Sequence, residues 1–445
     1  MIKTCYHNLR LFDGVHPYLQ EGKIIVVEDD RIKAVQDEAA RDRYLDHHLV
    51  DLNGYTLLPG LIDAHVHPTV PLALKLNLKV ILQMGRQVTM NFASFLKYGI
   101  TTIRDLASFS SKMQSWRQKI ESGSAPGPRI VTALSFLTSP GGVPEMAPTL
   151  NPVEALIAGG QFVERPREPD KVRRIAEGLI ARGADWLKTQ YSEESFLFHG
   201  RLNNLSDDCL RALMEVSTGR GVPVAMHHTE KAGFKKGLDL GVRTLEHCSL
   251  QELDQADVDL MVKKGISLVP TLKAIGDHAD MEAVLDWLTR EGRADFMPEP
   301  YRQTVAGLEL MRSRPYPPPD YRKKFYPDVD MLSRGYPITL KNVARVKKAG
   351  GRIGVGTDSC GTGLSFAGQY WRELWLLTQA GFSNVEALTA ATRINAGIIG
   401  LKDRVGTVEP GKYADFTVVE GNPLDDITAV KNVRTVIKGG LKVKG

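Results

Sequence analysis

Hydrophobic and polar positions near the amino end of the chain follow the pattern of short β-strands. Residues 23–27 are almost all branched aliphatic, the pair Asp29-Asp30 follows, and residues 31–35 alternate between polar and apolar. Two β-rich runs separated by a two-residue polar pair predict a β-hairpin.

The carboxyl end shows the same kind of pattern. We expect strands at 415–419, 433–438 and 441–443, with the last two joined by Gly439-Gly440. A diglycine is a favoured two-residue hairpin turn, because glycine tolerates positive φ. Both ends of the chain are therefore expected to be β, and they could share one sheet.

Between the two ends, short apolar runs alternate with longer amphipathic segments. This alternation is typical of βαβ units and of a parallel sheet. Eight such runs make a closed barrel of the TIM type, an α/β fold, the expected architecture. The expected strands are 61–67, 101–106, 129–134, 186–189, 223–227, 244–247, 267–271 and 353–358.

Two segments between these strands carry further local signals. Ser383 and Glu386 form an S-x-x-E capping box in front of residues 387–401, which predicts a long helix there. Residues 272–350 are far longer than a helical crossover and include a proline-rich stretch at 314–321. We expect an insertion over the mouth of the barrel, either a lid or a plain surface excursion.

Composition and charge exclude several classes of protein. The chain has 445 residues, of which 42% are hydrophobic and 24% charged, so a sizeable core is expected. Lys and Arg exceed Asp and Glu by 57 to 52, a scattered surplus that does not suggest nucleic-acid binding. No stretch approaches the ~18 apolar residues of a membrane span, and the four dispersed cysteines predict free thiols. We expect a cytoplasmic protein with a small-molecule substrate, and leave open whether it forms a homo-oligomer.

The first candidate for chemistry is the pair His65 and His67 in Leu58 to Pro68, LPGLIDAHVHP. Residues two apart on a strand point to the same side, so both imidazoles could share one metal ion. Zinc is commonly held by neutral imidazole nitrogens. An isolated H-x-H is equally compatible with two structural histidines, so the pair needs support from elsewhere.

That support comes from residues at the ends of other expected strands. Active sites of barrels are built at the carboxyl ends of their strands. Lys188, His227, His247 and Asp358 each close such a run. Taken singly, the lysine could pair with an acid, each histidine could be a hydrogen-bonded core residue, and Asp358 could cap a helix. Together with His65 and His67 they predict one site with six members.

These residues resemble the amidohydrolase superfamily, and specifically its two-metal branch. The resemblance rests on the order His-x-His, Lys, His, His, Asp and covers nearly the whole chain. It is closest to imidazolonepropionases and to prolidase-like and carboxypeptidase-like dipeptide hydrolases. Further matching motifs are GITTIRD at 99–105, GVRTLEH at 241–247, ATRIN at 391–395 and GTVEPGKYADF at 406–416.

The resemblance implies a domain division and a set of ligands. Residues 1–58 and 402–445 would form a β-sandwich beside a barrel of residues 59–401. Lys188 would be carboxylated by carbon dioxide and bridge two divalent ions, with Zn²⁺ favoured. One ion would be held by His65, His67 and Asp358, and the other by His227 and His247.

The resemblance also implies a reaction. A hydroxide that bridges the two ions would attack an amide carbonyl, that of a dipeptide or an N-acyl amino acid. Asp358 would take the hydroxide proton and pass it to the leaving amine.

One loop departs from the pattern of the dipeptide-cleaving relatives. Several of these carry a histidine after a double glycine following the third strand, where this chain has Gly141-Gly142-Val143. Their substrates therefore cannot be copied to this chain. Tyr191 could donate a hydrogen bond to substrate instead, although a surface tyrosine is equally compatible with the sequence.

Two alternative functions remain. His227 and Glu230 also match the His-x-x-Glu of one-metal deaminases and of hydrolases of cyclic amides or ureas, in which the glutamate shuttles a proton. Lys188 argues against this alternative, because a one-metal site has no use for a bridging ligand. A non-catalytic binding barrel would be expected to lack metal ligands, and all six are present.

Overall fold

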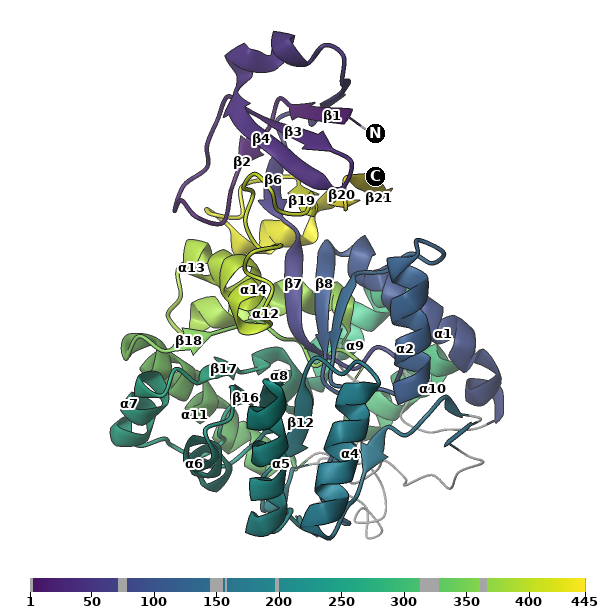
Figure 1. The fold of residues 1–445 in the computed structure, drawn as a ribbon, viewed down its shortest axis with the longest axis vertical. Coiled ribbons are helices and arrows are strands. Elements are labelled where there is room, and N and C mark those ends of the chain that lie inside the picture. The colour runs from purple at the N-terminus through teal and green to yellow at the C-terminus, as the bar shows by residue number, and fades with distance from the viewer. Residues whose placement is uncertain are drawn as a thin grey trace.

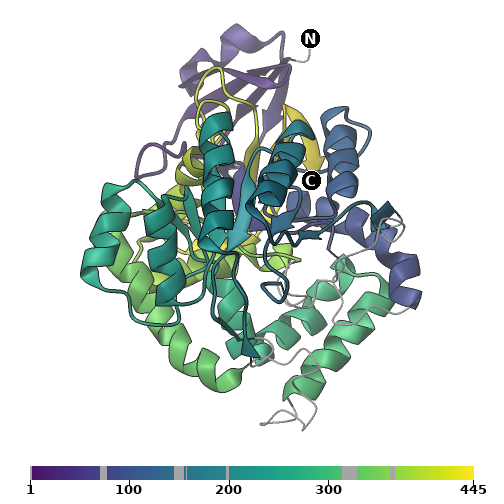
Figure 2. The ribbon, with the colours of Figure 1, turned by 60° about the horizontal axis from the view of Figure 1, so that its bottom comes forward.

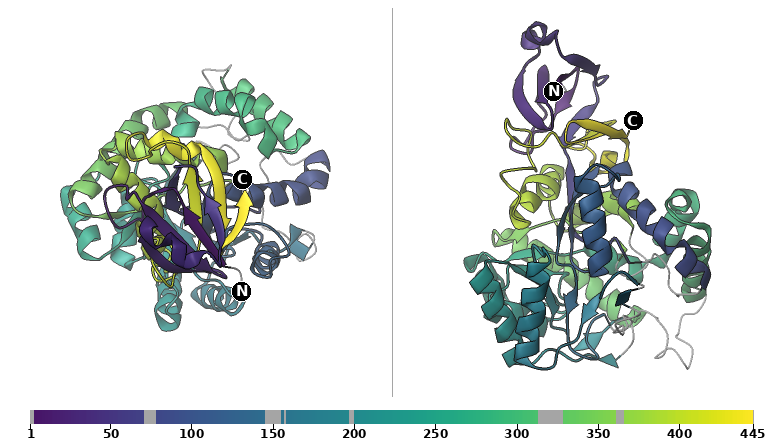
Figure 3. Two further views of the ribbon diagram at one scale, coloured as in Figure 1. Left: turned by 90° about the horizontal axis from the view of Figure 1, so that it is seen from above. Right: turned by 45° about the vertical axis from the view of Figure 1, so that its right-hand side comes forward.

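The computed structural model of the protein describes residues 3–70, 78–144, 155–156, 158–196, 200–312, 328–360 and 366–444. It shows a large α/β body with a small β unit at one end, and both chain termini lie on that unit (Figure 1). The right-hand view of Figure 3 shows the same division from another side. The fold is thus mixed α/β.

The small unit consists of two sheets and combines both ends of the chain. One sheet has the order β4-β3-β1-β5 and the other β2-β6-β19-β20-β21, so the expectation that the two ends share a sheet is confirmed. Apolar side chains from both ends, such as Tyr6, Leu57 and Phe416, form its core. The strands are β1 (Lys3–His7), β2 (Arg10–Leu11), β3 (Lys23–Glu28), β4 (Arg31–Asp37), β5 (His48–Asp51), β6 (Thr56–Pro59), β19 (Phe416–Val419), β20 (Val433–Lys438) and β21 (Leu441–Lys444).

Both predicted hairpins are present. Strands β3 and β4 pair antiparallel with Glu28 opposite Arg31, which leaves Asp29-Asp30 as the turn. Strands β20 and β21 are joined by Gly439 and Gly440, whose φ angles of 55° and 75° suit a two-residue turn that needs positive φ.

The parallel strands of the body lie in two sheets. One has the order β7-β8-β9 and the other β11-β10-β12-β15-β16-β17-β18. Seven of the eight predicted strands are present as β7 (Leu61–Val66), β8 (Ile100–Asp105), β9 (Arg129–Thr132), β12 (Leu187–Gln190), β15 (Val224–His227), β16 (Thr244–Glu246) and β17 (Ser267–Val269). The sequence analysis did not predict β10 (Phe136–Leu137) or β11 (Val163–Glu164).

The predicted strand at 353–358 was wrong in its extent, because β18 covers only Arg352–Ile353. The chain beyond β18 runs alongside β7 through single backbone hydrogen bonds. One joins the N–H of Asp358 to the carbonyl of His65 at 2.8 Å. Gly356 permits this approach, since a Cβ there would lie 2.7 Å from the Cβ of His65.

Asn395 joins β7 to the segment that follows β18. Its buried side chain donates to the carbonyls of Ile62 and Val355 at 2.7 and 2.8 Å and accepts from the N–H of Val355. The capping box of Ser383 and Glu386 is present. The long helix predicted at 387–401 is instead divided into α13 (Asn384–Thr389), a π-helical turn (Ala390–Ile394) and α14 (Asn395–Ile398).

Helices cover the strands on the outside, as Figure 2 shows from below. Helix α4 is typical, because it buries Val172, Ala176 and Leu179 on one stripe and leaves its other face to solvent. Within the described residues, no helix is both long enough and apolar enough to cross a membrane. The outer helices include α1 (Leu78–Lys97), α2 (Ser110–Glu121), α4 (Pro169–Ala181), α5 (Asp207–Arg220), α6 (Lys231–Leu240), α7 (Gln255–Lys263) and α12 (Tyr370–Gln379).

The long segment between β17 and β18 is mostly helical. It contains α8 (Leu272–Ala279), α9 (Met281–Arg290), α10 (Pro298–Arg312) and α11 (Val329–Lys348). Asp295, between α9 and α10, ties it to α1 through Lys97 at 2.7 Å and to the Tyr98 hydroxyl at 2.6 Å. The proline-rich stretch at 314–321 lies outside the described residues.

Candidate active site

His65, His67 and Asp358 come together beside the carboxyl end of β7. Nε2 of His67 lies 3.1 Å from Oδ1 of Asp358, and Nε2 of His65 lies 3.7 Å from the same oxygen. One ligand atom from each residue lies within 4.8 Å of the others, and all three side chains are buried. This spacing suits a single metal ion held by two imidazoles and a carboxylate.

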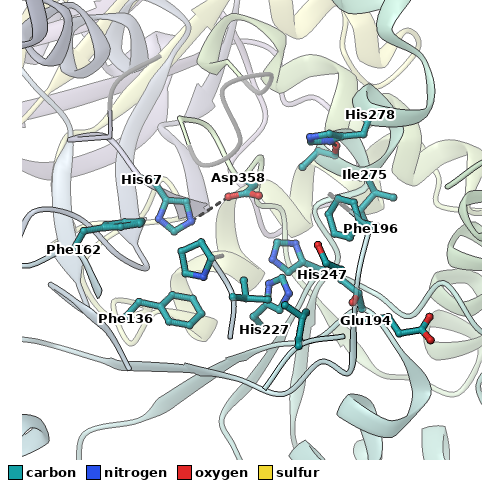
Figure 4. A pocket seen from close by; sticks show the side chains of 16 residues that line it. His67, Phe136, Phe162, Glu194, Phe196, His227, His247, Ile275, His278 and Asp358 are labelled. Carbon is teal, nitrogen blue, oxygen red and sulfur yellow. Dashed lines mark hydrogen bonds and ion pairs between the residues drawn. The ribbon is translucent and has the colours of Figure 1, made fainter. Parts of the chain in front are cut away.

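The two other predicted histidines adjoin this group. His227 ends β15 and His247 directly follows β16, so neighbouring parallel strands deliver both side chains to one place. Their ring centroids are 4.4 Å apart, and the His247 ring is 4.9 Å from the His65 ring. Figure 4 shows His67, Asp358, His227 and His247 around one pocket.

Lys188 is the most unusual member of the site. It lies on β12, its residue is 1% exposed, and its Nζ makes no hydrogen bond to any described residue. The nitrogen lies 5.6 Å from the centre of the Phe136 ring. A buried ammonium without a hydrogen-bond acceptor is costly, so this amine calls for a chemical explanation.

Three of the imidazoles are oriented by fixed hydrogen bonds at Nδ1. Nδ1 of His67 donates to the carbonyl of Ala107 at 2.8 Å, and Nδ1 of His247 lies 2.6 Å from the Thr271 hydroxyl. Nδ1 of His65 lies 2.8 Å from the Glu246 carboxylate. Each bond leaves Nε2 for another partner, which is the arrangement of metal-binding histidines.

The atoms at the centre therefore fit a metal ion. Nε2 of His65 is buried and, among the described residues, has no hydrogen-bond partner. Together with the amine of Lys188, it makes two buried polar atoms that no described residue satisfies with a hydrogen bond. Buried polar atoms are normally paired, so the two point to a bound group.

Burial and neighbouring charges give His65 and Asp358 the protonation states that metal ligands need, whereas at His67 burial is outweighed by Asp358 and the Ala107 carbonyl, which raise its pKa. Burial, and then the charge of Lys188, lowers the pKa of His65 to about 4, so its imidazole is neutral at pH 7. Burial alone would raise the pKa of Asp358, but His67 and the charges around it bring this pKa to about 2. Burial also lowers the pKa of Lys188 to about 8. The carboxylate is thus ionised, and the lysine is close to losing its proton.

The backbone at the site adopts conformations that are rare for residues other than glycine. The φ angles are 67° at His247, 54° at Asp358 and 44° at Thr271. Such angles are unfavourable in side-chain-bearing residues and concentrate at functional sites. Here these angles orient the side chains of His247 and Asp358, and also Thr271, whose hydroxyl bonds His247.

Sequence reasoning missed the residues that support the ligands. Glu246 is completely buried and bonds His65 on one side and Arg104 on the other, with Arg104 Nη2 2.7 Å from Oε1. Arg104 also donates to the carbonyl of Ala64 at 2.6 Å and stacks on Trp186 at 4.5 Å. The sequence did offer one signal, since Arg104 and Glu246 are charged residues within the expected strands 101–106 and 244–247. Buried charges are normally paired, so each of the two could have been expected to have a partner.

The side chains of Tyr191 and Glu230 contact residues outside the ligand cluster. The Tyr191 ring is half-buried and lies against Lys236 of α6, with Nζ 5.3 Å from its centroid. The Glu230 carboxylate accepts hydrogen bonds from the backbone N–H groups of Glu193 and Glu194 at 2.8 and 3.0 Å. Neither residue is among those that line the pocket.

A mostly apolar pocket lies over the ligands. Val143 and Pro144 line it, from the loop in which relatives were expected to carry a histidine. Ala274, Ile275 and His278 of α8 line it from the long segment between β17 and β18. The predicted insertion therefore contributes a wall of the pocket.

Comparison with known proteins identifies the family of the chain. Residues 56–443 match the family model described as "Amidohydrolase family". A search of curated proteins found no match to the chain.

Solved structures share the fold over nearly the whole chain. A crystal structure of an amidohydrolase is 25% identical, covers 99% of this chain and 98% of its own, and has a TM-score of 0.75. A Xaa-Pro dipeptidase with bound methionine in its active site is 24% identical over 100% of both chains, also with a TM-score of 0.75. An ochratoxinase from A. niger is 23% identical over 100% of this chain and 96% of its own, with a TM-score of 0.74. Because the family model matches residues 56–443, which are most of the chain, the chain belongs to the amidohydrolase family.

Proposed function

We propose that this amidohydrolase cleaves an amide C–N bond at a site for two divalent metal ions. Membership of the family makes it a hydrolase of carbon–nitrogen bonds. The observation that carries the two-metal proposal is Lys188, a buried amine that has no hydrogen-bond partner among the described residues and lies within a cluster of histidines.

Carboxylation of Lys188 would explain this amine. Reaction with carbon dioxide forms a bond from Nζ to carbon and releases a proton, which leaves an anionic carbamate. An ammonium group cannot bind a cation, whereas a carbamate has two oxygens that can bridge two ions. The pKa of about 8 at Lys188 favours this reaction, because only the neutral amine attacks carbon dioxide.

The remaining ligands divide into two sets. His65, His67 and Asp358 would hold one ion, and His227 and His247 the other, with the carbamate shared between them. Neutral imidazoles and carboxylate oxygens suit Zn²⁺, and Mn²⁺ or Co²⁺ would suit the same donors. When bound, the metal pair would polarise a carbonyl and lower the pKa of water.

Asp358 is the residue proposed to move protons. It is ionised at neutral pH and lies at the centre of the cluster, 3.1 Å from Nε2 of His67. It would accept the proton of the attacking water and deliver it to the leaving amine. Glu246 and Thr271 would keep the histidine rings in place during this cycle.

The one-metal alternative assigns the proton transfer to Glu230. Its two carboxylate oxygens already accept hydrogen bonds from Glu193 and Glu194, and it lies outside the pocket lining. The geometry therefore favours Asp358 over Glu230 as the group that exchanges protons with substrate.

The substrate class and the architecture complete the proposal. We propose a dipeptide or an N-acyl amino acid as substrate, supported by the fold shared with a Xaa-Pro dipeptidase. We also propose that residues 59–401 form a (β/α)₈ barrel beside a domain of residues 1–58 and 402–445. Support comes from backbone bonds that join the two parallel sheets, from Asp185 to Thr132 at 2.8 Å and from Asp358 to His65.

Metal analysis combined with a substrate screen tests this function. Protein saturated with Zn²⁺ is expected to bind about two ions per chain and to hydrolyse at least some N-acyl amino acids or dipeptides. Metal-loaded protein that hydrolyses no linear amide, but deaminates its substrate or opens cyclic amides, would support the one-metal alternative.

A further inference from the structure

The pocket has two apolar walls that belong to separate hydrophobic clusters. The first wall consists of Phe136, Val143 and Phe162, which pack together. The second wall consists of Phe196 and Ile275, which pack in another cluster with residues of α11. Figure 4 shows Phe136 and Phe162 on the His67 side of the pocket, and Phe196 and Ile275 beyond His247.

The metal ligands lie between these walls. The Phe162 ring is 6.4 Å from the ring of His67, and the Phe136 ring is 5.6 Å from Nζ of Lys188. The second wall is connected to His247 through Thr271. The Thr271 hydroxyl bonds Nδ1 of His247, and Thr271 directly precedes α8, the helix that contains Ile275. A carbonyl placed over the ligands would therefore have an apolar surface on each side.

Backbone hydrogen bonds hold both walls in place, within the first wall and from outside the second, so the walls are formed before substrate binds. The backbone N–H of Phe136 donates to the carbonyl of Phe162 at 3.0 Å, and the N–H of Asp328 donates to the carbonyl of Phe196 at 2.7 Å. Glu373 accepts from the N–H groups of Leu272 and Lys273 at the start of α8, the first at 2.9 Å. An apolar group that covers a preformed apolar wall removes apolar surface from water, which lowers the free energy of the complex.

We propose that the substrate carries a bulky apolar or aromatic group on each side of the scissile amide. This inference rests on the proposed amide hydrolysis and narrows its substrate class. The acyl group would occupy one wall and the side chain on the amine portion would occupy the other. N-aroyl derivatives of aromatic or large aliphatic amino acids have this form.

Four matched substrates test the proposal with the zinc-loaded full chain. They are N-benzoyl-phenylalanine, N-acetyl-phenylalanine, N-benzoyl-glycine and N-acetyl-glycine, assayed for kcat/KM. The doubly apolar compound is expected to exceed N-acetyl-glycine by about 100-fold or more, with the singly apolar compounds between them, since even one methylene in a hydrophobic pocket is worth about 10-fold to 200-fold.

Two variants then assign the walls. Phe162→Ala and Phe196→Ala are each expected to reduce, by about 10-fold, the advantage in kcat/KM that one phenyl group gives. The two variants should affect phenyl groups on opposite sides of the amide. Phe109→Ala is the matched control, because its ring is 5.9 Å from that of Phe162 but does not line the pocket. Should a variant fail to fold, the four-substrate comparison with the unaltered chain still decides.

The outcomes separate this inference from the proposed function. Hydrolysis of N-acetyl-glycine at a rate equal to that of N-benzoyl-phenylalanine would overturn the two-wall inference and leave amide hydrolysis intact. Equal losses from both variants on the same phenyl group would also overturn it. Hydrolysis of dipeptides but of none of the four would overturn the two-wall inference alone, whereas no hydrolysis of any of the four or of any dipeptide in the substrate screen would contradict the proposed function itself.

Discussion

The Nδ1 atom of His65 lies 2.8 Å from the Oε2 atom of Glu246, and both side chains are buried. Arg104 holds the other oxygen of the same carboxylate at 2.7 Å. Burial would raise the pKa of Glu246, but Arg104 and His65 hold it well below its usual range. The carboxylate is therefore ionised and fixes His65 with Nε2 toward the centre of the site.

We expect Glu246→Gln to lower the metal affinity by about 10-fold to 100-fold, the usual effect of losing a group that orients a metal-binding histidine. The amide would place an N–H₂ group against either Arg104 or Nδ1 of His65. Zinc titration against a competing chelator measures the change. Glu121→Gln, at an exposed glutamate, is the control; equal affinity in both variants would show that Glu246 does not position His65.

Replacement of Asp358 by Asn tests the proton transfer. The variant is expected to keep its fold and much of its metal while turnover falls by about 100-fold or more, since this is the contribution of a general base. Metal content and kcat on one good substrate are the measurements, with Asp239→Asn on the surface as control. Near-normal turnover in Asp358→Asn would mean that the base is another residue.

Lys188 and Glu230 distinguish the two enzyme mechanisms. We expect Lys188→Ala to lose metal and nearly all activity, with partial rescue by small carboxylic acids that fill the space of the carbamate. Glu230→Gln should keep its metal and change KM more than kcat, because its carboxylate binds the backbone just before Phe196 of the second wall. An inactive Glu230→Gln beside an active Lys188→Ala would reverse the assignment in favour of the one-metal mechanism.

Alkaline pH is expected to weaken the small β unit through Tyr6. Burial raises its pKa from 10 to about 12, so the folded chain holds a proton that the unfolded chain loses between these values. This contribution to stability is complete below pH 10 and is lost as pH rises toward 12, by about 1.4 kcal/mol per unit in that window. Urea unfolding at pH 9 and 11 should show a smaller loss for Tyr6→Phe than for the unaltered chain; equal losses would show that Tyr6 ionises freely.

The clustering of the candidate residues could be predicted in part, because several of them lie at or near the ends of parallel strands. The spacing of His65 and His67 places both on one side of β7, His227 ends β15, and Lys188 lies within β12, two residues before its end. The supporting contacts could not be predicted, since the bond from His65 to Glu246 joins residues 181 positions apart. Spacing along the chain carries no information on such a pair.

Parts of the fold could also not be predicted from the pattern of apolar and polar residues. The run at 353–358 has the composition of a strand, but its glycines let it lie against β7 through isolated bonds after only two residues of regular pairing. The helix expected at 387–401 contains a π-helical turn just before Asn395, whose side chain then reaches Ile62 and Val355. Tertiary contacts override local preference at both places.

The stoichiometry of bound metal tests the central claim most directly. Purified chain saturated with Zn²⁺ in bicarbonate buffer and freed of excess ion should contain about two ions, and Lys188→Ala about one or fewer. Elemental analysis against protein concentration gives both values. A content that saturates at one ion in the unaltered chain, and is unchanged in Lys188→Ala, would contradict the two-metal site and the bridging role of Lys188.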